Sequence, residues 1–458
     1  MDGVILSSGE HTSLMHGWVP VTVQAAAVAM LVLALARQRR SRLWRLPVSG
    51  GVGLLAAGCA YWFVTDDGLS GQPPPATLWL WIALAGTAAA LLVLGWRGAA
   101  WWRRGVSLLA VPLCLTSAAL TLNTWVGYFP TVQSAWSDLT AGPLPDQSDL
   151  ATVHAMAGSG AMPARGRVLQ VAIPADASHF RHRGELVYLP PAWFAPSPPP
   201  ALPAVMMIGG EFNTASDWLR SGGAIAAVDD FAAAHHGNAP VLVFVDSGGS
   251  FNNDTECVNG PRGNAADHLT EDVVPYLVSH FGVQPSHWGV VGWSMGGTCA
   301  VNLTAMHPDE FSAFVDIAGD LGPNAGTRAQ TISRLFGGSA AAWAAFDPST
   351  VIADHGRYDG VSGWFAVDSS ATMSDTGGQL AAAKTLCALG RANGIDCAVI
   401  AEPGRHDWPF AGRVFGHALP WLAGRLGTPG VAPIPLPAST TDSGPTPARH
   451  VEPGGSRR

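Results

Sequence analysis

The first 126 residues contain four long apolar segments with no Asp, Glu, Lys or Arg, and these segments most constrain the fold. They are residues 18–36, 46–64, 77–96 and 105–126. Each is close to the ~20 residues that a helix needs to cross ~30 Å of hydrocarbon. Helices in a soluble bundle would need a polar face toward water, and these segments have none. We therefore expect a region of four transmembrane helices over residues 1–126.

The arginines between these segments predict the orientation of the helices. The first connection contains Arg37, Arg39, Arg40, Arg42 and Arg45, and the third contains Arg97, Arg103 and Arg104. The second connection has no Lys or Arg but contains Asp66 and Asp67. Because positively charged loops stay in the cytoplasm, both termini should lie outside it. The sequence thus predicts a multi-pass membrane protein whose remaining residues are extracytoplasmic.

Composition limits the classes of possible partner, and the cysteines bear on whether the later residues can form disulfides. The net charge is -8 and no dense basic face is present, which argues against nucleic acid as a partner. Cys59 and Cys114 fall within apolar segments, so Cys257, Cys299, Cys387 and Cys397 remain for the outer domain. Four cysteines permit three pairings. A local Cys387–Cys397 disulfide is preferred, and buried free thiols are the alternative.

After a connector at residues 127–165, the chain changes to short β-rich runs. Residues 166–174 and 185–190 predict an opening antiparallel pair of strands. Six more runs follow, at residues 204–208, 241–245, 288–291, 313–317, 364–367 and 397–400. Several are followed by helical patterns, most clearly at 264–281 and 378–393, which is typical of a mostly parallel sheet covered on both faces. We expect an α/β domain over 166–427 and a disordered Pro/Ser/Gly-rich tail over 428–458.

The segment Gly292–Gly296 matches G-x-S-x-G, with Ser294 as the candidate nucleophile. The motif alone is weak evidence in a chain with 54 glycines. However, an apolar strand precedes it and a helical pattern follows it, as a nucleophile elbow requires. The alternative is an ordinary strand-to-helix turn. In an elbow, the backbone amide of Met295 would bind the oxyanion.

His406 is the preferred general base because it follows the last expected strand and lies C-terminal to the serine. His417 is the alternative, but it falls in a helical pattern. The acid should lie between Ser294 and His406, after the preceding strand. Asp375 is preferred, although it could instead cap a helix, and Asp368 at the strand end is the alternative.

Two further aspartates and two loops complete the candidate site. Asp396, at a strand start, and Asp407, beside the base, are weaker candidates for the acid. The second oxyanion donor should come from the loop after the first parallel strand, at Gly210, Glu211 or Phe212. The loop Asp246–Asn253 should border the pocket, although it could also be a solvent-exposed turn.

Residues 181–426 resemble the esterase family of α/β-hydrolases that includes esterase D-like enzymes and the mycolyltransferases of the mycobacterial antigen complex. The resemblance rests on RGELVYLPP (183–191), GWSMGG (292–297) with HPDEF (307–311), DTGG (375–378) and GRHDW (404–408). It implies a Ser–acid–His triad and supports Asp375, because the mycolyltransferases place their acid before a similar Gly-Gly turn. They have Glu where this chain offers Asp, and the loop here is slightly longer.

These observations predict a membrane-anchored serine esterase that acts on a small-molecule or lipid ester through an acyl-enzyme on Ser294. An acyltransferase that uses an envelope sugar or lipid as acceptor is the second hypothesis. A non-catalytic surface protein with the same fold is the third. No HExxH motif and no Cys/His cluster with zinc spacing is present, so the sequence implies neither a metal nor an organic cofactor.

Overall fold

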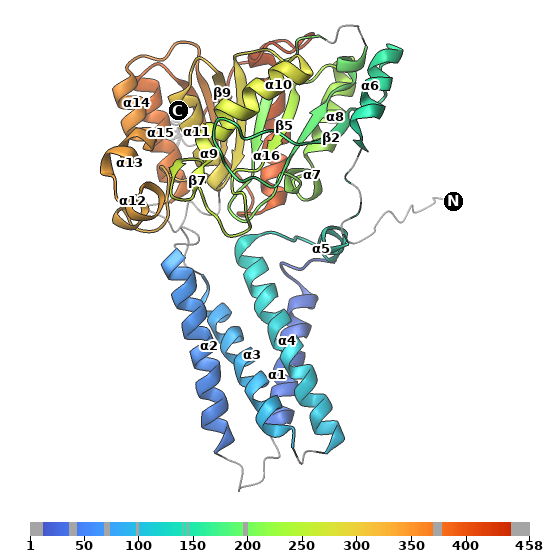
Figure 1. Cartoon of the computed structure of the whole chain (residues 1–458), viewed down its shortest axis with the longest axis vertical. Coiled ribbons are helices and arrows are strands. Elements are labelled where there is room, and N and C mark those ends of the chain that lie inside the picture. The colour runs from blue at the N-terminus through green and yellow to red at the C-terminus, as the bar shows by residue number, and fades with distance from the viewer. Residues whose placement is uncertain are drawn as a thin grey trace, which may run out of the picture.

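The computed structural model describes residues 12–35, 44–67, 74–97, 100–140, 142, 144, 146–195, 200–369 and 378–440. A bundle of long helices lies at one end of the molecule, and an α/β unit formed by the later part of the chain lies at the other (Figure 1). The two parts correspond to the two regions that the sequence predicts.

Four described helices are long and apolar enough to cross a membrane. They are α1 (Trp18–Leu35), α2 (Arg45–Asp67), α3 (Ala76–Gly95) and α4 (Trp101–Val126). Small residues such as Ala27, Ala85 and Ala110 pack inside the bundle, whereas Leu54 and Trp101 are exposed on its surface. This arrangement suits lipid, because close helix packing in membranes relies on small residues. The helices match the expected segments, except that α4 begins at Trp101 rather than at residue 105.

Successive helices of the bundle run in opposite directions (Figure 1). The start of α2, with Arg45, and the start of α4, with Arg103 and Arg104, therefore lie at the end far from the α/β unit. The C-terminal ends of α2 and α4 face that unit. Arg37, Arg39, Arg40 and Arg42, which also entered the orientation argument, lie outside the described residues.

Within the described α/β unit, one nine-stranded sheet has the order β1-β2-β3-β5-β4-β8-β9-β10-β11. Neighbouring strands are parallel except in the pairs β2–β3 and β3–β5. This topology confirms the predicted α/β-hydrolase fold and its opening antiparallel pair. The strands are β1 (Gln147–Ser148), β2 (Arg167–Val171), β3 (Glu185–Leu189), β4 (Ala204–Ile208), β5 (Val241–Val245), β8 (Trp288–Trp293), β9 (Phe311–Ile317), β10 (Ser362–Asp368) and β11 (Asp396–Glu402). A separate hairpin pairs β6 (Asn259–Gly260) with β7 (Gly263–Asn264).

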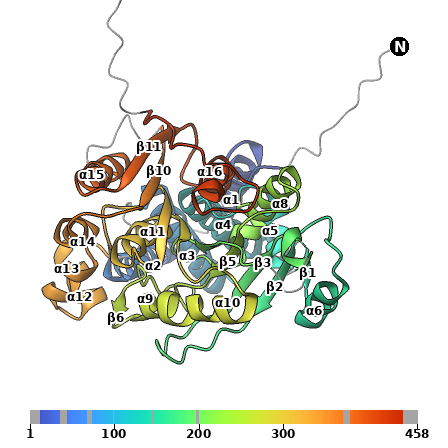
Figure 2. The same cartoon turned by 90° about the horizontal axis from the view of Figure 1, so that it is seen from above.

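Helices cover both faces of the sheet (Figure 2). Successive residues of a strand point to opposite faces, so Met206 of β4 packs into one core and Val205 into the other. The Val205 side is covered by α8 (Ala224–Ala234) and α16 (Trp408–Arg425). The Met206 side is covered by α10 (Val274–Phe281), α11 (Met295–Met306), α14 (Pro348–His355) and α15 (Gln379–Ala392). Shorter helices are α5 (Val132–Leu139), α6 (Leu150–Ser159), α7 (Asp217–Arg220), α9 (Ala265–Asp267), α12 (Arg328–Phe336), α13 (Ala340–Phe346) and a 3-10 turn (Pro191–Phe194).

The borders of the α/β unit differ from those expected. The connector contributes β1 to the sheet and Val153 of α6 to the core. The tail is not disordered over residues 428–440: Ser439 Oγ accepts a hydrogen bond from the Val399 amide, and the Thr440 amide donates to the Val399 carbonyl, both at 3.1 Å. These contacts cover β11, whose outer backbone groups would otherwise be unpaired. Residues 441–458 lie outside the described part.

The structure also tests the predicted disulfide and the helix expected over 264–281. The described residues form the disulfides Cys387–Cys397, which was the preferred local pair, and Cys257–Cys299. The second joins the segment after β5 to α11, which carries the candidate nucleophile at its start. The helix expected over 264–281 is interrupted by a π-helical turn, His268–Val273, between α9 and α10.

Candidate active site

Ser294 lies between β8 and α11 with φ 58° and ψ −122°, a conformation that non-glycine residues rarely adopt. The neighbouring glycines make this turn possible. A Cβ at Gly292 would overlap the backbone of Gly296, and one at Gly296 would collide with the backbone at the end of β4. Met295 begins α11, so its amide has no acceptor one turn earlier in the helix. The geometry is that of a nucleophile elbow with one oxyanion donor.

His406 lies in the loop between β11 and α16, and its Nε2 is 3.0 Å from Ser294 Oγ. The imidazole packs against Trp293, with ring centroids 5.1 Å apart. Burial lowers the pKa of His406 to about 4, although the negative charge of Asp368 opposes this shift. The imidazole is therefore neutral at pH 7 and can accept the serine proton. The alternative base, His417, lies on α16, where its Nδ1 is 3.1 Å from a Glu402 carboxylate oxygen.

The structure describes three of the four candidates for the triad acid. The preferred residue, Asp375, lies outside the described residues. Asp368 is buried at the end of β10, and its charge acts on His406. The weaker candidates are far from this role: Asp396 is exposed at the start of β11, and Asp407 caps α16 by accepting a hydrogen bond from the Phe410 amide.

Gln379 is a site residue that the sequence analysis missed. Its Nε2 lies 3.3 Å from His406 Nδ1, the ring nitrogen that a triad acid holds. A side-chain amide can present either its oxygen or its nitrogen to such a partner. The only signal in the sequence was its position, directly after the Gly-Gly pair that follows Asp375.

The loop after β4 lies against the nucleophile. A Cβ built on Gly210 would lie 3.2 Å from Ser294 Cβ, which is a tight contact, so glycine favours this close approach. The Gly210 amide donates to Asn213 Oδ1 at 2.9 Å and is therefore already engaged. Among the three expected donors, Glu211 and Phe212 remain as partners for Met295 at an oxyanion.

Arg183 holds the loop after β4 in place through hydrogen bonds. One guanidinium nitrogen, Nη2, donates to the Asn213 carbonyl and to Asp246 Oδ1, both at 2.6 Å. Burial raises the pKa of Asp246, but the hydrogen bond and charge of Arg183 outweigh this effect and leave it below its usual value. The loop Asp246–Asn253 thus contributes to the site by holding Arg183, which in turn holds the oxyanion loop.

Comparisons with known proteins agree with this geometry. Residues 180–394 match the family model described as "Putative esterase". The chain carries an esterase-like α/β-hydrolase domain. It is 29% identical over 257 residues to an uncharacterized protein of Corynebacterium glutamicum, covering 55% of this chain and 59% of that protein. It is also 29% identical over 201 residues to the diacylglycerol acyltransferase/mycolyltransferase Ag85A of Mycobacterium gordonae, covering 37% of this chain and 58% of that one. The matches thus span less than two thirds of either relative.

Among solved structures, an S-formylglutathione hydrolase from Agrobacterium tumefaciens is similar to the chain, with a TM-score of 0.47 and 17% identity. That match covers 58% of this chain and 97% of the other. The family match and the relatives support an esterase-like α/β-hydrolase domain in this chain.

A group of buried carboxyls lies beside the oxyanion loop of this esterase-like domain. Burial raises the pKa of Glu256 well above its usual range, and the nearby charges of Asp254, Asp320 and Glu211 raise it further. Burial likewise raises the pKa of Asp254 to about 6. Asp254, Glu256 and Asp320 are scattered along the chain and were not singled out in the sequence, and Glu211 was expected only as a backbone donor.

A cleft of about 460 Å³ begins at Asp320 and extends toward the start of α15. Its lining includes Asp320, Asn324, Trp343 and Asp347, together with Gly378, the residue before Gln379. The cleft therefore combines acidic, amide and aromatic side chains and adjoins Gln379, which contacts His406.

The loop that carries His406 contacts the bundle of four apolar helices. Gly127, the residue after α4, has φ 72°, and a Cβ there would lie 2.5 Å from the His406 carbonyl oxygen and 3.0 Å from Asp407 Cα. On the other side, Arg334 Nη2 donates to the Thr65 carbonyl in α2 at 3.1 Å. The edge of the α/β unit that carries His406 thus faces the C-terminal ends of α2 and α4 (Figure 1).

The low pKa of His406 predicts the acidic limb of the pH profile. Only the neutral imidazole can accept the serine proton, so kcat/KM should fall on acidification near the pKa of about 4, well below the ordinary value of 6.5. Asp368→Asn should move this limb to still lower pH, because the charge of Asp368 raises the pKa of His406. The profile is measured with a soluble ester while circular dichroism monitors folding. Asp396→Asn, at an exposed position, should leave the limb in place, and a wild-type limb at 6.5 or higher would contradict the prediction.

Proposed function

We propose that this protein is a membrane-anchored, extracytoplasmic serine esterase that hydrolyses carboxylic esters presented at the membrane surface. The observation that carries the proposal is the 3.0 Å contact between Ser294 Oγ and His406 Nε2. It occurs on a loop that packs against the end of a helix able to span the membrane. A non-catalytic surface protein would need neither the strained serine nor this contact.

The mechanism is a two-step acyl transfer. His406 Nε2 takes the hydroxyl proton as Ser294 Oγ attacks the ester carbonyl, and the amides of Met295 and of Glu211 or Phe212 bind the oxyanion. The intermediate collapses, and His406 returns the proton to the leaving alcohol. Water then attacks the acyl-enzyme with His406 again as base, which releases the acid and restores Ser294.

The triad acid in this mechanism is Asp375, with Asp368 as the alternative. Its role is to hold the Nδ1–H tautomer of His406 and to stabilise the imidazolium that forms. Asp375 is favoured by its position before a Gly-Gly turn, and the neighbouring Gln379 brings the start of α15 to Nδ1. Asp368 is favoured by its electrostatic effect on His406.

Two observations support an extracytoplasmic catalytic domain. Arg45, Arg103 and Arg104 lie at the far end of the bundle, as expected if that end faces the cytoplasm (Figure 1). Both pairs of cysteines in the α/β unit are disulfide-bonded, and disulfides persist mainly in oxidising compartments.

Transfer of the acyl group to an envelope sugar or lipid alcohol is the second candidate function. The cleft beside the start of α15 favours it, because carboxyl and amide groups such as those of Asp320 and Asn324 can bind several hydroxyls of an acceptor. The mycobacterial relative is named as an acyltransferase, which also favours this function. Product analysis with water alone, and with added sugar or lipid alcohol, separates the two functions.

The membrane part of the proposal predicts a preference for lipid-borne esters. In the full chain reconstituted in nanodiscs, kcat/KM for an acyl ester carried in the bilayer should exceed that for a water-soluble short-chain ester by roughly tenfold or more. The reason is that the catalytic loop lies next to the membrane helices, which concentrate such substrates near Ser294. Both esters are assayed with the same preparation, and Ser294→Ala gives the background rate. Equal values for the two esters would contradict a role of the membrane in substrate presentation while leaving the esterase proposal intact.

A further inference from the structure

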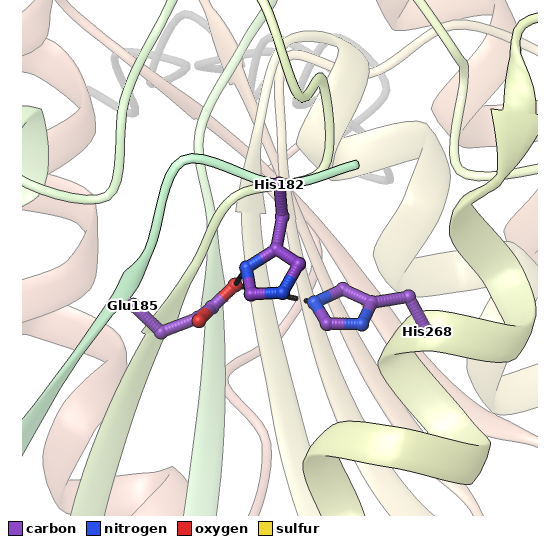
Figure 3. A group of neighbouring side chains, drawn as sticks. All are labelled: His182, Glu185 and His268. Atoms are coloured by element: carbon purple, nitrogen blue, oxygen red, sulfur yellow. Dashed lines mark hydrogen bonds and ion pairs between the residues drawn. The ribbon is translucent and has the colours of Figure 1, made fainter. Parts of the chain in front are cut away.

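Two histidines and a glutamate meet in the interior at the start of β3 (Figure 3). Ligand atoms of His182, Glu185 and His268 all lie within 4.8 Å of one another. The side chains of Glu185 and His268 are completely buried, and that of His182 is 14% exposed. His182 and Glu185 are three residues apart in sequence, whereas His268 comes from the π-helical turn, 83 residues beyond Glu185. None of these residues has a role in the mechanism above.

The two nitrogens of His268 both face carboxylate oxygens. Nδ1 is 3.2 Å from Asp272 Oδ2, and Nε2 is 3.2 Å from Glu185 Oε1. Asp272 is held in place by the hydroxyl of Ser178 and the amide of Ala177. A neutral imidazole carries one N–H, so when Nδ1 donates to Asp272, the Nε2 lone pair points at a carboxylate oxygen. A positive charge between Nε2 and Oε1 removes this repulsion.

The other surroundings of the Glu185 carboxylate also favour a positive charge beside it. His182 Nδ1 lies 2.7 Å from Oε1, so this one oxygen faces a ring nitrogen of each histidine and needs a proton or a metal ion between them. The second carboxylate oxygen, Oε2, is buried and has no hydrogen-bond partner among the described residues. A buried carboxylate with an unpartnered oxygen is costly unless it is paired with a charge or coordinates a metal.

We propose that His182, Glu185 and His268 bind a divalent transition-metal ion, and that Zn²⁺ suits this set of donors best. Zn²⁺ is bound by imidazole nitrogens and carboxylate oxygens in tetrahedral sites. Two ligands of one such ion lie roughly 3.3 Å apart, given metal–ligand distances of about 2.0 Å, and the separation of His268 Nε2 from Glu185 Oε1 is 3.2 Å. Asp272 supplies the carboxylate behind a metal-bound histidine that usually fixes the ring and its tautomer.

The metal would act as a structural clamp rather than in catalysis. It would join the start of β3 to the π-helical turn, and π-helical turns often occur at functional sites. Arg183, which follows the first ligand directly, holds Asn213 and Asp246 behind the oxyanion loop. Metal binding would therefore stabilise the fold and, through Arg183, that loop. The proposal does not depend on the esterase function and can be tested without an activity assay.

The test measures metal content and thermal stability of the full chain in detergent, purified with an affinity tag that contains no histidine. After treatment with a chelator and addition of Zn²⁺, followed by desalting, mass spectrometry of the metal should find about one Zn²⁺ per chain. Excess Zn²⁺ should raise the Tm of the chelated protein by about 5 °C at a concentration ~100-fold above Kd. Co²⁺ in place of Zn²⁺ should give visible absorption bands typical of tetrahedral coordination.

Two substitutions make the test specific. His182→Gln keeps a side-chain amide near Glu185 but removes a metal ligand, and it should lose both the bound Zn²⁺ and the rise in Tm. His280→Gln, at an exposed histidine on α10, should retain both. Because His182 is partly exposed, the first variant is expected to fold, and circular dichroism checks this. A folded wild-type protein that binds less than about 0.1 Zn²⁺ per chain, or equal binding by wild type and His182→Gln, would overturn the proposal and leave a proton-bridged cluster.

Discussion

Replacing Ser294 with alanine should abolish covalent labelling by a fluorophosphonate probe and lower kcat for ester hydrolysis by on the order of 10⁴-fold or more. Without Oγ no acyl-enzyme can form. His406→Ala should cause a similar loss, because no other described group lies at hydrogen-bond distance from Ser294 Oγ to take its proton. The double variant should be no slower than either single variant, since the two residues act as one unit. Labelling is followed by in-gel fluorescence of the full chain in its membrane.

The matched control for the histidine is His417→Ala. His417 is on α16, C-terminal to the same loop, and its side chain pairs with Glu402 instead of Ser294. This variant should label at the wild-type rate. If Ser294→Ala still labels at the wild-type level, the nucleophile is elsewhere and the proposed mechanism fails.

Asp375→Asn should lower kcat by about 10²- to 10⁴-fold with little change in thermal stability. An amide in place of the acid cannot stabilise the imidazolium and favours the wrong tautomer of His406. Asp368→Asn should reduce kcat by less, since in the proposal it acts on His406 only through its charge. Kinetics of both variants with one soluble ester gives the comparison.

Asp396→Asn serves as the control for both aspartates, because this residue is exposed at the start of β11. Its kcat should equal that of the wild type. A larger loss in Asp368→Asn than in Asp375→Asn would reassign the acid to Asp368 and make the loop residue Asp375 dispensable.

Local patterns were sufficient for most of the fold. The strands β4 and β5 match the apolar runs at 204–208 and 241–245 residue for residue, because strands buried on both faces are continuously apolar. The four charge-free apolar segments likewise predicted the helices α1 to α4 to within a few residues, because the absence of charge over about 20 residues is itself the signal. The contact between Ser294 and His406 could be expected from chain order, since the positions of both residues follow from where their strands end.

The features that could not be predicted from the sequence depend on contacts between residues far apart in the chain. Glu185 and His268 form a cluster across 83 positions, and no motif spacing shows this. Gln379 reaches His406 only because β10 and β11 are neighbours, which puts the start of α15 beside the loop after β11. The connector and the tail have weak patterns of their own. They join the α/β unit because the edge strands of the sheet have free backbone groups that they can bind. Val399 on β11, for example, forms hydrogen bonds with Ser439 and Thr440.

The contact of Ser439 and Thr440 with β11 matters for how copies of this protein meet one another. Proteins confined to a bilayer meet one another in two dimensions, where encounters are frequent and orientations are restricted. An open outer strand on each copy would let two sheets join edge to edge and begin a chain of self-association. Ser439 and Thr440 already occupy the outward-facing backbone groups of Val399 and Ala401 on β11. The short segment before residue 441 therefore blocks this part of the sheet edge to a strand from another copy.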